Sequence, residues 1–124
     1  MAEKTRYSDE ELAEFRELIT QKLELAKEDL DFYKTQLIER ADNSDTKPKG
    51  LDDGGATSET ERLANLASRQ EKYIKHLQNA LIRIKNKVYG VCRVTKKLIS
   101  KERLRAVPHA TLSIHAKMAQ GSRR

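Results

Sequence analysis

Apolar positions recur at alternating steps of four and three along two long stretches of the chain. The first stretch contains Ile19, Leu23, Ala26, Leu30, Tyr33 and Leu37. The second contains Leu63, Ala67, Gln70, Ile74, Leu77, Leu81, Ile84 and Val88. This spacing is the heptad pattern of helices that pack side by side. Between the two stretches lie residues 46–55, which include Pro48 and three glycines and are not expected to be helical. The pattern predicts an antiparallel two-helix hairpin.

The first helix has a clear start signal. Ser8 can cap it, and Glu11, three residues later, completes a capping box. The run Asp42-Asn43-Ser44-Asp45 interrupts the pattern, so we expect a helix over about 9–41 and a tip loop over 42–58.

The second helix has a similar signal. Ser58 is its expected cap and Glu61 the partner in the box, so we expect a helix over about 59–88, before Gly90. Gln70 falls on the apolar seam, where a polar contact would fix the register of the two helices.

The pattern changes after Gly90. Residues 91–99 are rich in β-branched side chains that mostly alternate, which predicts one or two short strands or a hairpin turn. Ser100 is the expected cap of a short helix over 101–106, which Pro108 ends. Residues 110–118 can form another short helix or turn.

Composition agrees with a narrow apolar seam rather than a thick core. Charged residues make up 35% of the chain and the mean hydropathy is −0.79. We therefore expect a mainly α protein, with a coiled-coil hairpin over 1–88 and a small C-terminal globule over 89–124. A single cysteine excludes an internal disulfide. No membrane-spanning stretch or signal peptide is expected, so we expect a cytoplasmic protein.

Charge is distributed unequally between the two halves. Residues 1–60 hold 9 Lys and Arg against 16 Asp and Glu, whereas residues 61–124 hold 16 against 3. The net charges are therefore −7 and +13. One interpretation is that an acidic arm pairs with a basic arm. The other is that the basic half meets nucleic acid or an acidic protein face.

The C-terminal block carries a resemblance to a known family. Its landmarks are Tyr89-Gly90-Val91-Cys92, then Ile99, then the run from Arg103 to Leu112, which includes Arg103-Leu104, Ala106 and Pro108. Together with the order helix, acidic tip, helix and globule, they resemble the DksA/TraR family of regulators that bind RNA polymerase. The resemblance implies a coiled-coil hairpin followed by a zinc-finger-like globule.

The chain departs from that family at the zinc site. Of the four ligand positions that the resemblance implies, only Cys92 is a cysteine; the others are Thr95, Ser113 and Ala116. Thr and Ser lack the thiolate of structural zinc sites, and Ala has no donor. His109 and His115 could be invoked to rescue a site, but we expect an apolar core in place of zinc. Its expected members are Val91, Val94, Leu98, Ile99, Leu104, Leu112 and Ile114.

The resemblance also implies how such a protein acts. Members of the family insert the hairpin into the secondary channel of RNA polymerase, with tip aspartates and a small alanine as effectors. The candidates here are Asp52, Asp53 and Ala56. Lys49 stands at the place of the first tip aspartate. Turn chemistry alone is the competing explanation, since Asp and Gly are common in tight turns.

Family members often respond to guanosine tetraphosphate (ppGpp), held by basic residues. By resemblance, the possible polymerase or ppGpp contacts are Arg69, His76 and Lys117. His76 replaces a lysine and Val107 replaces an arginine. Two lost cations weaken phosphate attraction, so we do not expect ppGpp to be an effector of this chain.

The leading hypothesis is a monomeric regulator that binds RNA polymerase and has no enzymatic activity, because no nucleophile lies at a suitable spacing from a base. The alternative is a basic coiled-coil protein that binds nucleic acid. We do not expect direct DNA binding, because the basic half lacks interleaved aromatics and a groove-reading motif. A coiled-coil module that dimerises is a third possibility.

Overall fold

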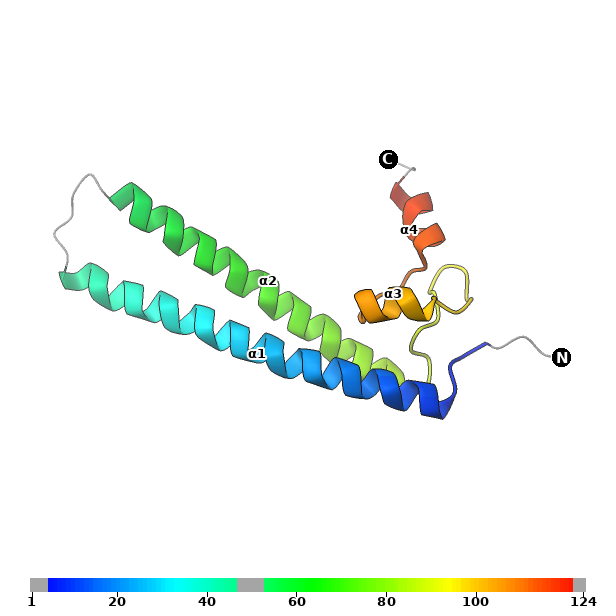
Figure 1. Ribbon diagram of the computed structural model, residues 1–124. Coiled ribbons are helices and arrows are strands. Elements are labelled where there is room, and N and C mark those ends of the chain that lie inside the picture. Colours follow the sequence, from blue (N-terminus) through cyan, green and yellow to red (C-terminus); the bar gives the residue numbers. More distant parts are fainter. Residues whose placement is uncertain (1–4, 47–52, 122–124) are drawn as a thin grey trace. The chain divides into compact units, whose positions relative to one another are not determined.

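The computed structural model describes residues 5–46 and 53–121. The helices in these ranges are α1 (Asp9–Thr46), α2 (Asp53–Lys85), α3 (Lys101–Ala106) and α4 (Ile114–Gly121). Figure 1 shows α1 and α2 side by side and running in opposite directions. The predicted mainly α fold with an antiparallel hairpin is therefore confirmed. Within the described part of the chain, no helix is long and apolar enough to span a membrane.

The chain packs as two compact units. The arm unit holds residues 23–46 and 53–75, and the globule unit holds residues 5–22 and 76–121. The first and last turns of the hairpin thus pack with the C-terminal residues, whereas the sequence predicts a division at residue 88.

In the arm unit, the seam follows the predicted heptads. Its buried apolar side chains are Leu23, Ala26, Leu63, Ala67 and Ile74. Gln70 donates from Nε2 to the carbonyl oxygen of Ala26 at 3.3 Å, which is the polar seam contact expected from the sequence. Exposed ion pairs join Lys34 to Glu71 and Arg40 to Glu59 across the two helices. In both pairs α1 supplies the cation and α2 the carboxylate, so these two contacts do not follow the predicted pairing of an acidic first arm with a basic second arm.

The start of α1 is a capping box, as predicted. The Glu11 amide donates to Ser8 Oγ at 3.1 Å, and the Ser8 amide donates to Glu11 Oε1 at 2.9 Å. Two amides that the first helical turn leaves without a carbonyl partner are thereby satisfied. Glu11 also forms an ion pair with Lys101 of α3 at 2.6 Å, so the cap is tied to the globule.

The helix ends nearest the tip differ from the prediction. α1 continues to Thr46 instead of ending near residue 41, and α2 begins at Asp53 instead of residue 59. Ser58 therefore lies inside a helix and is not its cap. Asp, Asn and Ser lower helix stability by only a few tenths of a kcal/mol, and Gly by about 1 kcal/mol. Such residues weaken a helix without ending it.

The other end of α2 comes earlier than predicted. The Val88 amide donates to the Arg83 carbonyl and the Lys87 amide to the Ile84 carbonyl, each at 3.0 Å, and Lys87 has φ of 63°. This pair of bonds is a Schellman cap with Lys87 at the left-handed position that glycine usually occupies. Val88, predicted to lie on the seam, is 51% exposed because the helix has already ended.

The segment after Gly90 forms a hairpin-like turn. Val91 and Leu98 make an isolated antiparallel bridge. Among the described residues, there is no strand longer than this bridge. The Lys96 amide donates to the Cys92 carbonyl and the Cys92 amide to the Lys97 carbonyl, both at 2.8 Å. Of the two alternatives drawn from the sequence, the structure contains the turn. α3 has the predicted bounds, with Ser100 as its cap.

The core of the globule unit differs in membership from the one predicted. Ile99 and Leu104 are fully buried as expected, but Val94 and Ile114 are each 54% exposed. The space is filled by residues outside the predicted set, because the first turns of α1 pack onto the globule. The added buried residues are Tyr7, Phe15, Tyr89, Cys92, Ala110 and Ala116.

Candidate functional site

An aromatic cluster joins α1 to the residues after α2. The Phe15 ring lies between Tyr7, at a centroid distance of 5.6 Å, and Tyr89, at 5.3 Å. The Tyr7 hydroxyl donates to the Ile99 carbonyl, and the Tyr89 hydroxyl donates to the Pro108 carbonyl at 2.8 Å. Burial raises the pKa of both tyrosines, so both stay neutral donors.

The landmarks of the family resemblance are mostly structural residues of this globule. Tyr89 and Leu104 are fully buried. Gly90 has φ of 80°, and its carbonyl accepts from the Ile99 amide at 2.7 Å. The Arg103 guanidinium donates from Nε to the Leu112 carbonyl at 2.8 Å. The landmark residues thus stabilise the fold of the globule through burial, a left-handed backbone at Gly90 and a side-chain hydrogen bond from Arg103.

The four positions at the place of the zinc ligands lie together. Cys92 Sγ accepts hydrogen bonds from the amides of Ser113, at 3.3 Å, and Thr95, at 3.5 Å. The Ala116 amide donates to Ser113 Oγ at 3.2 Å, and Ala116 is buried. Amide-to-sulfur hydrogen bonds and a small apolar side chain thus link the two segments that carry these positions.

Cys92 is the one cysteine at the four zinc-ligand positions. Burial raises the pKa of its thiol, but hydrogen bonds from the Thr95 side chain and from the amides of Thr95, Ser113 and Val94 outweigh this effect and lower the pKa to about 6. Within residues 5–46 and 53–121, no group of three or more His, Cys, Asp or Glu could hold a metal ion. His109 and His115 therefore form no such group with Cys92.

A cationic cluster forms where α2 meets the C-terminal residues. We define it as His76, Arg83, Arg103, His109 and Lys117. The His76 and His109 rings stack with centroids 5.4 Å apart and planes inclined by 11°. Arg83 donates from Nη2 to the His109 carbonyl at 3.4 Å.

The electrostatics of this cluster oppose further positive charge. Burial lowers the pKa of His109 from 6.5, and His76, Arg83, Arg103 and Lys117 lower it further, in that order. Burial also lowers the pKa of Arg83, although Tyr89 counters part of this effect. The neutral form of His109 is therefore favoured.

The predicted site residues are only partly brought together. His76 on α2 and Lys117 on α4 both lie in the cationic cluster of the globule unit. Arg69 is exposed and belongs to the arm unit. Of the tip residues, Asp53 and Ala56 lie in the first turn of α2, and Asp52 lies outside the described residues.

Arg83 and His109 were not among the predicted contact residues. A signal for Arg83 exists in the sequence, because it follows His76 by seven residues and so shares its helix face. His109 could not be placed beside His76 from sequence, because the stack depends on how residues 107–110 return to α2.

Comparisons with known proteins give relatives in both sequence and structure. No family model matches the chain. A protein named RNA polymerase-binding transcription factor DksA, from Caulobacter vibrioides strain NA1000 / CB15N, is 41% identical over 63 residues. The same-named protein of strain ATCC 19089 / CIP 103742 / CB 15 matches equally. The match covers 49% of this chain and 44% of the length of each relative.

Among solved structures, the transcription factor DksA2 from Pseudomonas aeruginosa has a similar fold. The TM-score is 0.80 at 24% sequence identity, over 90% of this chain and 84% of the other. Together the comparisons confirm that this chain resembles the DksA/TraR family, in sequence over about half of its length and in fold over 90% of it.

Proposed function

We propose that this chain is a bacterial transcription regulator that binds RNA polymerase directly. The observation that carries the proposal is the 41% identity to proteins that are themselves named RNA polymerase-binding transcription factors. The shared DksA2 fold supports it. Acting by contact, such a regulator needs no catalytic residue of its own.

The proposed mode of action is insertion of the hairpin tip into the polymerase secondary channel. In an antiparallel pair, the end of the hairpin where α1 finishes and α2 begins is the part that can reach a narrow channel first. Asp52 and Asp53 would bring carboxylates toward the catalytic Mg²⁺, where negative charge changes metal and substrate electrostatics. Ala56, one turn into α2, would leave room for the channel wall.

The proposed role of the globule is to hold the outer rim of the polymerase. Its fold is secured by the buried Tyr89, Ile99 and Leu104 and by hydrogen bonds to Cys92 Sγ. The proposal therefore needs no zinc. It also assigns no effector role to ppGpp, because His76 and Val107 stand where the resemblance implies two cations.

The test combines binding with transcription on core RNA polymerase and holoenzyme. The wild-type chain should bind core enzyme as a monomer and change the lifetime of promoter complexes. The Asp52→Asn/Asp53→Asn double variant should bind but lose that effect. Asp29→Asn/Asp31→Asn is the matched control, because it removes the same charge from exposed positions of α1 and should behave as wild type.

Two outcomes would contradict the proposal in different ways. Absence of binding to core enzyme would rule out a polymerase regulator. Binding with an unchanged effect of the tip variant would leave the partner in place but show that these aspartates are not the effectors. A gel shift on duplex DNA tests the alternative function, because phosphate contacts would give strongly salt-dependent binding.

A further inference from the structure

A cavity of about 550 Å³, partly open to solvent, lies between the first turns of α1 and the end of α2. All of its lining residues belong to the globule unit. They are Asp9, Leu12, Ala13, Arg16, Thr20, Leu81, Ile84, Lys85 and Lys87. The volume falls within the range of roughly 300–1,000 Å³ that small-molecule sites occupy. None of these residues belongs to the tip, the cationic cluster or the Cys92 site.

The sequence of α1 explains why space is left here. Asp9, Ala13, Arg16 and Thr20 follow one another at helical spacing and form a stripe beside the buried stripe of Leu12, Phe15 and Ile19. Where a hairpin packs tightly, such flanking positions carry side chains that cover the seam. Ala13 and Thr20 are too short to do so, which leaves a hollow beside the buried seam.

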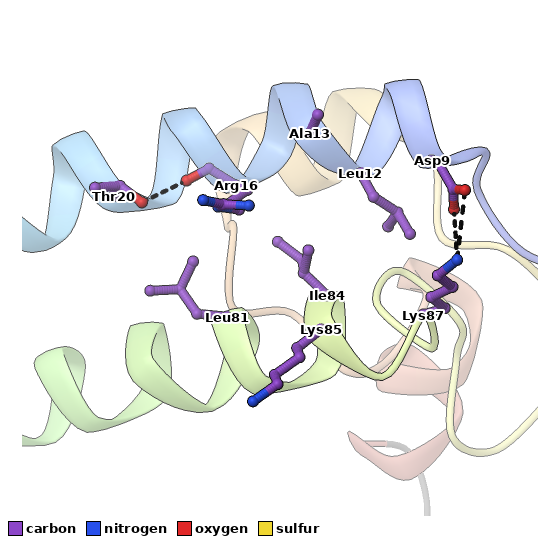
Figure 2. A pocket seen from close by; sticks show the side chains of 9 residues that line it. All are labelled: Asp9, Leu12, Ala13, Arg16, Thr20, Leu81, Ile84, Lys85 and Lys87. Atoms are coloured by element: carbon purple, nitrogen blue, oxygen red, sulfur yellow. Dashed lines mark hydrogen bonds and ion pairs between the residues drawn. The ribbon is translucent and has the colours of Figure 1, made fainter.

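The wall is mostly apolar. Leu12, Leu81 and Ile84 project into the space between the two helices (Figure 2). Leu12 and Ile84 are 4% and 8% exposed and Leu81 is half-buried, so Leu81 contributes most of the accessible apolar wall. An apolar molecule that displaced water from this wall would gain hydrophobic free energy.

The rim is cationic. At one end, Lys87 Nζ lies 3.3 Å from Asp9 Oδ1, and this ion pair neutralises both groups (Figure 2). Arg16 carries a further positive charge and makes no ion pair within the described part of the chain, whereas the Lys85 side chain extends away from the space between the helices (Figure 2). A guanidinium beside an apolar wall favours an anion that carries an apolar body.

We propose that this cavity binds a small amphipathic anion, of which a medium-chain carboxylate is the simplest example. The aliphatic body lies on Leu12, Leu81 and Ile84, and the carboxylate lies at the Arg16 guanidinium. Binding at this site requires no polymerase, so it can be measured on the isolated chain.

The test compares octanoate with 1-octanol, which have the same aliphatic length and differ in charge. Amide chemical shifts of the ¹⁵N-labelled chain are followed during titration, with octanoate kept below its micelle concentration. Octanoate should shift amides of residues 9–20 and 81–87 and should bind more tightly than octanol. Absence of shifts in these segments, or equal binding of the two molecules, would overturn the proposal.

Variants separate the two parts of the site. Arg16→Gln should weaken octanoate binding about 3- to 10-fold, as expected for loss of one partly exposed charged contact, and leave octanol binding unchanged. Lys97→Gln removes an exposed cation outside the cavity and should have no effect. Ala13→Phe should fill the cavity and abolish binding of both molecules, while the exposed position allows the chain to fold. Octanoate binding that survives both Arg16→Gln and Ala13→Phe would contradict this site.

Discussion

Gly90 packs directly against the ring of Tyr7. A Cβ atom at position 90 would lie 2.6 Å from Tyr7 Cε2 and 3.1 Å from Leu104 Cδ1. The φ of 80° at Gly90 is a second reason for glycine at this position, since residues with a side chain rarely adopt that backbone conformation. The glycine that follows Tyr89 in the family landmark is thus required by the packing of Tyr7, which precedes α1, on the globule.

Gly90→Ala should therefore lower the free energy of unfolding by about 2–5 kcal/mol, since a left-handed backbone costs about 1–2 kcal/mol and an overpacked core about 1–3 kcal/mol. Urea unfolding followed by circular dichroism measures this change. Val94→Ala is the control, because Val94 is mostly exposed in the same loop and should leave stability near wild type. Equal stabilities of the two variants would show that Tyr7 does not pack on Gly90.

The Cys92 thiol should ionise with a pKa of about 6, compared with 9.0 for an ordinary thiol. Thiolate absorbance near 240 nm, measured against pH, gives this value. Thr95→Val should raise the pKa, because it removes the side-chain hydrogen bond that lowers it most. A wild-type midpoint near 9 would contradict the hydrogen-bonded geometry of the sulfur.

The same ionisation makes stability depend on pH. Because the folded-state pKa lies below the unfolded one, the thiolate contributes stability that is fully present above about pH 9 and lost as the pH falls through about 6. Unfolding measured between these values should show wild type gaining stability with pH relative to Cys92→Ala. Parallel curves for the two proteins would exclude a stabilising thiolate.

His109 should titrate below 6.5, because burial and then His76, Arg83, Arg103 and Lys117 disfavour its charged form. Its contribution to stability is present above pH 6.5 and is lost as the pH falls through the lower, folded-state value. The imidazole carbon-bound proton shifts in NMR report the midpoint directly.

Substitution tests the cause of that shift. His76→Gln removes the stacked imidazole and should raise the His109 midpoint toward 6.5. His115→Gln, at an exposed position of α4, should leave it unchanged. If His109 has the same midpoint in His76→Gln as in the wild type, the two rings do not stack in solution.

The hairpin was predictable because its signals are local. Heptad spacing, the Ser8–Glu11 box and the Gln70 seam contact all follow from neighbouring residues on one helix face. The helix ends were less predictable. Lys87 has a left-handed backbone conformation that sequence patterns assign to glycine. The weak helix formers near the tip are part of the helices, so α1 ends later and α2 begins earlier than predicted.

The candidate sites were predictable to a smaller extent. The resemblance drew attention to Cys92, Thr95, Ser113 and Ala116, and the structure places all four in one neighbourhood. It did not reveal the His76–His109 stack or the cavity beside Leu12, because both depend on packing between segments distant in sequence. The tip assignments remain predictions.

The central claim is that the hairpin tip enters the secondary channel of RNA polymerase, and site-specific photo-cross-linking tests it most directly. A benzophenone amino acid at position 56 would be irradiated in complex with core enzyme, with position 28, on the exposed face of α1, as the control. The account predicts that position 56 cross-links to polymerase segments beside the catalytic Mg²⁺, at a yield that Asp52→Asn/Asp53→Asn does not abolish. Cross-links from position 56 only to the outer polymerase surface, or none at all from a bound complex, would contradict it.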